Sequence, residues 1–468
     1  MNHKNSYFYE KKLRKSLALL SVIILSSSTF CTAQSPDEVQ VKRIVNEVMT
    51  NSTAYANLRT ICKDIGPRLS GSINAQKAVE ATAQMLRDAG ADKVYLQPCM
   101  VTHWERGAKE SGFVKINGKK TNLQLAALGN SEGSGKKPVQ GDVVEVKSMQ
   151  ELHKLGNAVK GKIVFFNIKM NPTHIETFRA YSESGIGRRS GPSQAAKYGA
   201  VGVMVRSLAS NIDEYPHTGA TQYNDSFPKI PAVAISTMQS EMISASLSAG
   251  NKVSGSFKTN CRMLPDALSY NVIGEIVGST KPDEIITVGG HLDSWDLAEG
   301  ANDDGSGCVQ SIEVIRSIKA LGLKPERTIR AVMFMNEENG GGGGDAYYDS
   351  AVSKKENHLL AIESDAGGFT PRYFGIKGTK KVIDKLSSWA SIFQPYGIQS
   401  LKEGSGGADI ENLAKLGTTL VGYTPDSQRY FDIHHAATDV FENVSKRELD
   451  LGAANITALI YLVSKYGL

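Results

Sequence analysis

Three apolar runs between residues 285 and 365 each end abruptly in acidic or imidazole side chains and glycine. They read IITVGGHLD, TIRAVMFMNEENG and LLAIESDAGG. Continuous apolar runs, as opposed to alternating ones, are typical of buried parallel strands. The carboxyl ends of such strands share one edge of the sheet, where ligands bind. The pattern therefore predicts that the polar residues at these three strand ends meet in one site.

The rest of the chain predicts helices and strands in alternation. Helices are expected at residues 38–49, 53–62, 74–89, 306–321, 380–392 and 446–466, with another starting near residue 346. Outside the middle of the chain, strands are expected at residues 92–98, 270–276, 284–288, 328–335, 359–363 and 418–422. This order favours an α/β fold with a mainly parallel sheet covered by helices.

The composition changes near Gly118. From there to about residue 261 the predicted elements are short, rich in strands and punctuated by glycine. No cluster of histidine, aspartate and glutamate stands out in this stretch. We expect residues 119–261 to form an inserted accessory domain that supplies shape and not chemistry. Residues 34–118 and 262–468 would then form the catalytic domain.

The amino-terminal segment has the pattern of an export signal. The formal net charge is +5, and residues 1–33 contribute +4 of it, so the remaining chain offers no basic surface for nucleic acid. Basic residues precede an apolar run at 17–25 that is shorter than the ~20 residues of a membrane span. We expect a cleaved signal peptide at residues 1–33, a secreted or periplasmic protein and no later transmembrane segment. Phe30 disfavours lipid attachment at Cys31.

Four cysteines follow the signal, at positions 62, 99, 261 and 308. None forms a closely spaced CxxC pair, which argues against zinc held by thiolates. Cys308 lies in an apolar helical pattern and is expected to be a buried free thiol.

The polar residues at the strand ends suit metal ligation. His291 and Asp293 are two apart on a strand, so their side chains point the same way, and Asp293 is placed to orient the imidazole. Asp303 lies on the loop that leaves the same strand, where its two oxygens can bridge two cations. Adjacent strand-end carboxylates diverge, so one of Glu337 and Glu338 can bind metal while the other acts as a general base.

Further candidates lie beyond these strands. Asp365 ends the third run, and the pair His434-His435 is followed by Asp439, which is placed to orient His435. Glycines 340–344 allow a sharp turn of the backbone. Two histidines, three carboxylates and one additional glutamate suit two divalent cations with a preference for nitrogen and oxygen ligands, and zinc fits best.

Five sequence blocks resemble, in order, those of the co-catalytic zinc exopeptidases of the carboxypeptidase Q type. These blocks are GHLDSWD, NDDGSG, NEENG, ESDAGG and YFDIHHAATD, and the middle segments KYGAVGVMVRS, PHTG and PKIPAVAIS fit as well. The resemblance implies a phosphorylase/hydrolase-like α/β fold with a mixed, mostly parallel sheet and helices on both faces. It also implies that residues 119–261 are a β-rich protease-associated cap, and that the protein forms a homodimer.

The resemblance also implies roles for single residues. One zinc would be held by His291 and Asp365 and the other by Glu338 and His435, with Asp303 bridging both. The remaining implied roles are Glu337 as general base, Asp293 as the partner of His291, His434 in place of an oxyanion-binding tyrosine, and Ser405 and Gly406 as substrate contacts.

The expected function is hydrolysis of dipeptides or short peptides by an exported dinuclear zinc exopeptidase. An aminopeptidase that acts on longer peptides is the alternative within this class. A glutaminyl-cyclase-like acyl transferase would need only one functional zinc, and an inactive binding module would have lost ligands, whereas this chain retains all five.

Overall fold

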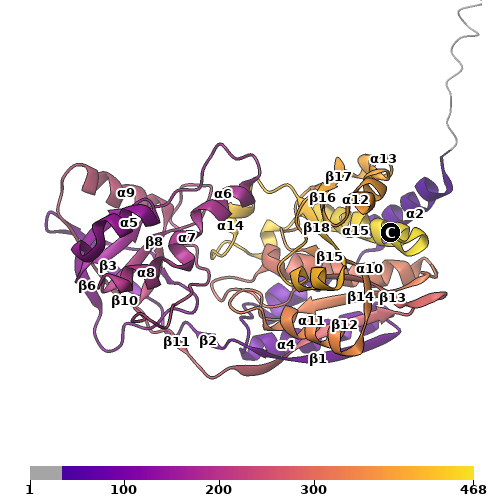
Figure 1. Cartoon of the computed structure of the whole chain (residues 1–468), viewed down its shortest axis with the longest axis horizontal. Helices are drawn as coiled ribbons and strands as arrows, with labels where there is room; N and C mark the ends of the chain where they lie inside the picture. The colour runs from indigo at the N-terminus through magenta and orange to yellow at the C-terminus, as the bar shows by residue number, and fades with distance from the viewer. Residues whose placement is uncertain (1–33) are drawn as a thin grey trace, which may run out of the picture. The chain divides into compact units, whose positions relative to one another are not determined.

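The structure, a computed structural model, describes residues 34–468; the expected export signal and Cys31 lie outside the described residues. Two eight-stranded sheets dominate it (Figure 1). The strands of the first sheet are, in spatial order, β1 (Lys93–Val101), β12 (Ala267–Ile276), β14 (Arg327–Phe334), β13 (Lys281–His291), β15 (Asn357–Ser364), β18 (Thr419–Pro425), β16 (Pro371–Lys377) and β17 (Ser400–Glu403).

The middle of the first sheet is parallel. Strands β14, β13, β15 and β18 run parallel to one another, as do β16 and β17, while β1, β12 and the β16–β18 pair are antiparallel. The predicted mixed and mostly parallel sheet is therefore present. Strands β16 and β17 were not expected from the sequence.

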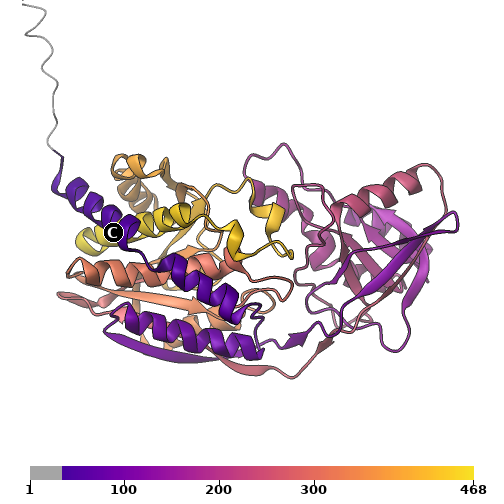
Figure 2. The ribbon, with the colours of Figure 1, turned by 180° about the vertical axis from the view of Figure 1, so that it is seen from behind.

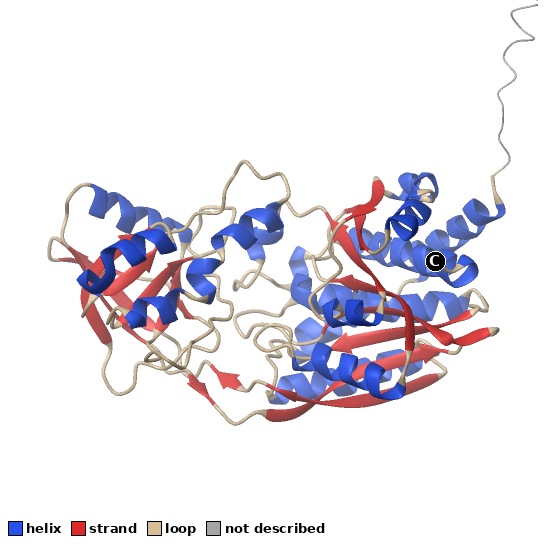
Figure 3. Ribbon diagram, in the orientation of Figure 1, coloured by secondary structure: helices blue, strands red, loops and turns tan. Residues whose placement is uncertain are grey.

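Helices flank the first sheet on both faces (Figure 3). Those around it are α2 (Pro36–Asn51), α3 (Ala54–Arg59), α4 (Ile73–Asp88), α10 (Ser306–Ala320), α11 (Gly342–Lys354), α12 (Lys380–Ser387), α13 (Ala390–Phe393), α14 (Tyr430–Ile433) and α15 (Lys446–Tyr466). Short helical turns are η1 (Thr60–Ile65), η3 (Ala301–Gly305), η4 (Gln394–Tyr396), η5 (Glu411–Leu416) and η6 (Phe441–Asn443). Seen from behind, α4 in indigo lies beside the sheet (Figure 2), and it contacts β1 and β12.

Residues of the central strands alternate between two cores. In β14, Ala331 and Met333 pack into the core shared with α4, α10 and α15, while Val332 and Phe334 pack on the other face with α11 and η5. Both faces are buried, which explains why the strand reads as a continuous apolar run. Helix α11 begins at Gly342, so the glycine tract opens a helix after its turn.

The second sheet lies in the middle of the chain and is mixed. Its strands are β4 (Lys119–Asn122), β3 (Ser111–Ile116), β10 (Val253–Lys258), β6 (Val139–Val146), β7 (Ile163–Phe166), β8 (Gly202–Arg206), β9 (Ala232–Ile235) and β5 (Leu125–Ala127). Around it lie α5 (Met149–Leu155), η2 (Gly156–Val159), α6 (Thr177–Ser184), α7 (Ile186–Arg189), α8 (Gly191–Lys197) and α9 (Thr237–Ser248). A separate pair, β2 (Trp104–Glu105) and β11 (Arg262–Met263), carries the chain into this region and out again.

The second sheet begins earlier than residue 119. Strand β3 starts at Ser111 and pairs with both β4 and β10. Asn117 and Gly118 both have positive φ, 48° and 85°, and form the tight turn of the β3–β4 hairpin. Asn-Gly is the favoured pair for such a turn. The change in composition near Gly118 thus coincides with a hairpin inside the second sheet and not with the start of that sheet.

Two expectations about the remaining chain can be compared with the structure. The four cysteines at 62, 99, 261 and 308 are free and buried, as expected for Cys308. Within residues 34–468, no helix combines the length and the apolar character that a membrane span requires.

A buried arginine ties the loop after β13 to the amino-terminal part of the domain. The guanidinium of Arg68 donates to the backbone carbonyls of Leu292 (2.5 Å), Glu299 (2.6 Å) and Gly300 (2.9 Å). Arg68 is fully buried. This loop leads directly into η3, so Arg68 holds the backbone that presents Asp303.

Replacement of Arg68 by methionine tests this role. Arg68→Met leaves three carbonyls without their charged donor, and we expect the free energy of unfolding to fall by about 2–4 kcal/mol. Urea denaturation followed by circular dichroism measures the change. Arg59→Met is the control, because Arg59 is exposed and makes only a 3.7 Å ion pair with Asp64. Equal stability of the two variants would contradict the role assigned to Arg68.

Candidate active site

Three neighbouring parallel strands deliver polar residues to one edge of the first sheet. Strand β13 ends at His291, β14 ends shortly before Glu337 and Glu338, and β15 ends just before Asp365. Because β13 lies between the other two and is parallel to both, these ends lie side by side. The strand-end pattern in the sequence therefore predicts this grouping correctly.

Asp303 lies at the centre of the group and contacts two histidines. Its Oδ1 is 3.2 Å from Nε2 of His291, and its Oδ2 is 3.2 Å from Nε2 of His435. Each histidine has a second carboxylate: Asp365 Oδ1 is 3.4 Å from His291 Nε2, and Glu338 Oε2 is 3.0 Å from His435 Nε2. Two histidine–carboxylate groups thus share one aspartate.

The backbone fixes which nitrogen of each histidine faces the group. Nδ1 of His291 donates to the carbonyl of Asp293 at 2.9 Å, and Nδ1 of His435 donates to the carbonyl of Thr218 at 3.2 Å. Each imidazole therefore turns its Nε2 towards the carboxylates. A histidine that binds a metal is held in this way through its other nitrogen.

The electrostatics of the group favour a bound cation. Burial, reinforced by the charge of Asp303, raises the pKa of Glu338 to about 7. Burial likewise raises the pKa of Glu337 well above its ordinary value and that of Asp365 above its own. Burial lowers the pKa of His291, but the charge of Asp365 and other acidic neighbours outweigh it, so the pKa lies well above the usual range. Nearby positive charge relieves such crowding of acids.

The donor set fits a pair of metal ions. Asp303 Oδ2 is buried without a hydrogen-bond partner, although it lies 3.2 Å from Nε2 of His435. Imidazole nitrogen and carboxylate oxygen are the ligands of catalytic zinc sites. Two sets of three ligand-type side chains lie close enough to hold an ion: His291 with Asp303 and Asp365, and Asp303 with His434 and His435.

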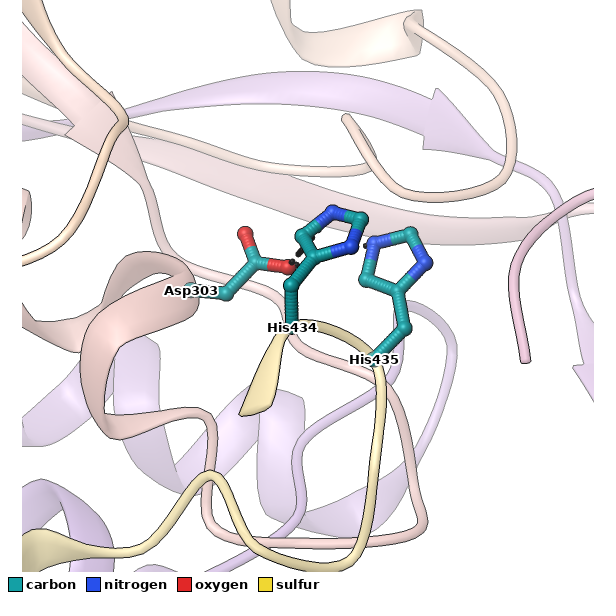
Figure 4. A group of neighbouring side chains, drawn as sticks. All are labelled: Asp303, His434 and His435. Carbon is teal, nitrogen blue, oxygen red and sulfur yellow. Dashed lines mark ion pairs between the residues drawn. The ribbon is translucent and has the colours of Figure 1, made fainter. Parts of the chain in front are cut away.

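Either His434 or Glu338 could be the third side chain of the group formed by Asp303 and His435. Figure 4 shows the rings of His434 and His435 side by side next to the carboxylate of Asp303. The rings stack with centroids 3.6 Å apart, but His434 Nε2 is 3.6 Å from Asp303 Oδ2, farther than His435. His435 is also the histidine in contact with Glu338, so we take Glu338 as the third member. Burial lowers the pKa of His434 well below its ordinary value.

The side chain of Asp293 binds the backbone turn before Glu337 and not the imidazole of His291. Its carboxylate accepts hydrogen bonds from the backbone amides of Asn336 at 2.6 Å and Glu337 at 3.1 Å. Its Oδ1 is 3.9 Å from His291 Nδ1, beyond hydrogen-bond range, because its own carbonyl occupies that nitrogen. The expectation that the Asp293 side chain orients His291 is therefore wrong: the backbone does so, and the side chain positions Glu337.

Two further aspartates position the loop that carries Asp303. Asp439, expected to orient His435, instead accepts hydrogen bonds from the backbone amides of Asn302 at 2.8 Å and Asp303 at 3.1 Å. Asp304, which was not singled out from the sequence, accepts from the amide of His291 at 3.0 Å. In the sequence, only the position of Asp304 beside Asp303 could have indicated that it belongs to the site.

The site opens into a cavity of about 420 Å³. Asp303, Glu337, Glu338, Asp365, His434 and His435 line one part of it, and residues of the middle region line another. Ser405 and Gly406 are not among the lining residues; Gly406 packs against Leu420 and the backbone of Gly422. The structure therefore does not bring these two expected substrate contacts to the site.

The middle region reaches the two histidines directly. His217 Nδ1 donates to the carbonyl of His434 at 2.6 Å, and the amide of Thr218 donates to the carbonyl of His435 at 3.0 Å. His435 has φ 62°, an uncommon value for a non-glycine residue, and these contacts hold its turn. The middle region therefore helps to position the two histidines, and the sequence did not predict these contacts. In the sequence, the segment Pro216 to Gly219 was noted only as part of the family resemblance and not for a contact with the histidines.

Comparisons with known proteins identify related chains. The model of "Peptidase family M28" matches residues 271–460. Carboxypeptidase Q of Bos taurus is 34% identical over 426 residues, which span 90% of this chain and 88% of that protein.

Two solved structures are also similar to this chain. A peptidase M28 precursor from Shewanella amazonensis has a TM-score of 0.88 and 29% identity, covering 92% of this chain and 97% of its own. A zinc aminopeptidase from Bacillus subtilis has a TM-score of 0.63 at 21% identity, covering 88% of this chain and 94% of its own, which shows a shared fold. The predicted α/β fold class is confirmed. The chain belongs to peptidase family M28, and the predicted enzyme class, a metalloexopeptidase, is confirmed with it.

Proposed function

We propose that this protein is an exported dinuclear zinc exopeptidase that hydrolyses dipeptides or short peptides. The observation that carries the proposal is Asp303, whose two oxygens each face a different histidine–carboxylate group. A carboxylate with this arrangement suits a bridge between two cations. The resemblance to carboxypeptidase Q supports the short-peptide substrate.

The proposed ligands divide between two zinc ions. His291 and Asp365 would hold one ion, Glu338 and His435 would hold the other, and Asp303 would contact both. Nitrogen and oxygen donors with no thiolate suit zinc in a catalytic site. When bound, the ions lower the pKa of water and polarise the peptide carbonyl.

Glu337 is the proposed general base. It lines the cavity, and Asp293 fixes its backbone beside the ligand Glu338. In this role its carboxylate takes a proton from the attacking water and later delivers that proton to the leaving amine. His434, whose Nδ1 is buried without a hydrogen-bond partner, is the proposed donor to the developing oxyanion.

The remaining features of the proposal concern organisation and location. Residues 111–258 form the protease-associated cap, and the flanking segments form the catalytic domain. A signal peptide at residues 1–33 is cleaved, which makes the protein secreted or periplasmic. The family resemblance supports a homodimer, and light scattering of the purified mature chain tests it.

Replacement of the proposed base separates catalysis from metal binding. Glu337→Gln keeps the shape and the neighbouring ligands, so we expect two zinc ions per chain and a loss of kcat of about 100- to 10,000-fold on a dipeptide. Metal content and turnover are measured on the same preparation. Glu403→Gln, an exposed change at the end of β17, is the control with unchanged values. Substantial residual activity in metal-loaded Glu337→Gln would contradict the role of Glu337 as general base.

Metal counting tests the shared aspartate. We expect two zinc ions in the native protein, about one in Asp365→Ala and none retained after dialysis in Asp303→Ala, because only Asp303 belongs to both ligand sets. Elemental analysis per chain gives the numbers, with circular dichroism as the check on folding. One zinc per native chain together with cyclisation of amino-terminal glutamine would favour an acyl transferase instead.

A further inference from the structure

The two histidines at the proposed metal positions are held by different parts of the chain. On one side, Nδ1 of His291 donates to the carbonyl of Asp293 at 2.9 Å. The amide of His291 donates to Oδ2 of Asp304 at 3.0 Å, and its carbonyl accepts from Sγ of Cys308 at 3.1 Å. These three partners lie on the loop and the helix that directly follow β13. The first sheet and its own connections therefore hold His291 in place.

His435, in contrast, is held by the middle region. Thr218 contacts it twice: its amide donates to the carbonyl of His435 at 3.0 Å, and its carbonyl accepts from Nδ1 of His435 at 3.2 Å. The same carbonyl accepts from Nη1 of Arg188 at 3.3 Å, and that Nη1 lies 3.5 Å from Nδ1 of His435. A backbone group 217 positions earlier in the chain thus orients this imidazole.

His217, the residue before Thr218, holds the turn that carries His435. Its Nδ1 lies 2.6 Å from the carbonyl oxygen of His434, and its side chain is buried. Burial lowers the pKa of His217 to about 4, so the ring is neutral. A carbonyl only accepts hydrogen bonds, so the single ring proton is on Nδ1. His435 has φ 62°, and a non-glycine residue keeps such a value where surrounding contacts impose it.

Buried hydrogen bonds connect His217 and Thr218 to the second sheet. The amide of His217 donates to Oγ of Ser207 at 2.8 Å, and that Oγ donates to the carbonyl of Ile235, the last residue of β9, at 2.7 Å. Oγ1 of Thr218 donates to the carbonyl of Ala127, the last residue of β5, at 2.8 Å. Strands β9 and β5 are neighbours in that sheet. The turn at His435 is therefore tied to one end of the second sheet.

We propose that His217 and Thr218 make the middle region a structural part of one proposed metal position, that of His435 and Glu338, and not of the other. This inference rests on the proposed dinuclear centre and deepens it. His217 is a positioning residue, because it acts through the backbone carbonyl of His434. Groups that orient a metal ligand from outside contribute to metal affinity. The position of His291 and Asp365 should bind its ion without help from the middle region.

Stepwise zinc binding tests the inference. The purified protein, stripped of metal, is titrated with zinc in competition with a chromophoric chelator, which gives the affinity of each ion. His217→Leu removes the donor but keeps a side chain of similar size, and we expect it to weaken one binding step by about 10- to 100-fold and to leave the other unchanged. His217→Asn keeps an N–H donor near the place of Nδ1, so both steps should stay close to those of the native protein. Equal weakening of both steps by His217→Leu, or of neither, would overturn the inference.

Two single-ion backgrounds identify the step that changes. Asp365→Ala keeps the ligands of the His435 position. Glu338→Ala keeps those of the His291 position. Adding His217→Leu should weaken the ion of the Asp365→Ala protein and leave that of the Glu338→Ala protein unchanged. The reverse pattern would contradict the assignment of His217 to the His435 position.

Two further variants separate a local effect from a general loss of stability. His358→Leu removes another buried histidine, which is hydrogen-bonded to Thr287 and Glu356, and it should leave both binding steps unchanged. Ser207→Ala removes the hydroxyl that fixes the amide of His217, and it replaces His217→Leu if that variant does not fold. We expect Ser207→Ala to weaken the same step by about 2- to 10-fold. Two unchanged steps in a folded Ser207→Ala protein would then overturn the inference.

The outcomes separate this inference from the proposed function. A native protein that binds two ions, loses one selectively in His217→Leu and hydrolyses no dipeptide would contradict the peptidase and leave the inference supported. Full peptidase activity in a protein whose two steps respond equally to His217→Leu would overturn the inference and leave the peptidase supported. A single binding step in the native protein would contradict both.

Discussion

The structure depends on one electrostatic constraint: several buried carboxylates converge at the edge of the first sheet. Asp303, Glu338 and Asp365 surround two imidazoles, and burial raises the pKa of Glu338 and Asp365. Like charges at such distances in a poorly solvated site repel strongly. A fold that keeps them together needs positive charge between them, and the proposed metal ions would supply it.

A surrounding layer of hydrogen bonds to the backbone holds this cluster in place. Arg68 donates to three carbonyls of the loop after β13. Asp439 accepts from the backbone amides of Asn302 and Asp303, and Asp293 accepts from the backbone amide of Glu337. These groups act on loops, which would otherwise be the least rigid part of the site. The positions of the proposed ligands therefore depend on hydrogen bonds that Arg68, Asp439 and Asp293 make to the backbone of these loops.

The central strands and the grouping of the polar residues at their ends could be predicted from the sequence. The apolar runs before His291, Glu337 and Asp365 predict buried strands, and parallel strands necessarily bring their ends to one edge. The role of Asp293 could not be predicted, because the spacing does not show whether a carbonyl or a carboxylate occupies His291 Nδ1. The contacts of His217 and Arg188 with His434 and His435 could not be predicted either, because they join residues more than 200 positions apart in the sequence. The composition change at Gly118 predicts a boundary, but β3 and β4 pair across Asn117-Gly118, because local composition does not reveal strand pairing.

The central claim is that Asp303 joins two metal ions at this sheet edge. A crystal structure of the zinc-loaded protein with anomalous data on both sides of the zinc absorption edge tests it most directly. We expect two anomalous peaks per chain, one between His291 and Asp365 and one between Glu338 and His435, each with an oxygen of Asp303 in contact. A single peak, or two peaks that do not share Asp303, would contradict it.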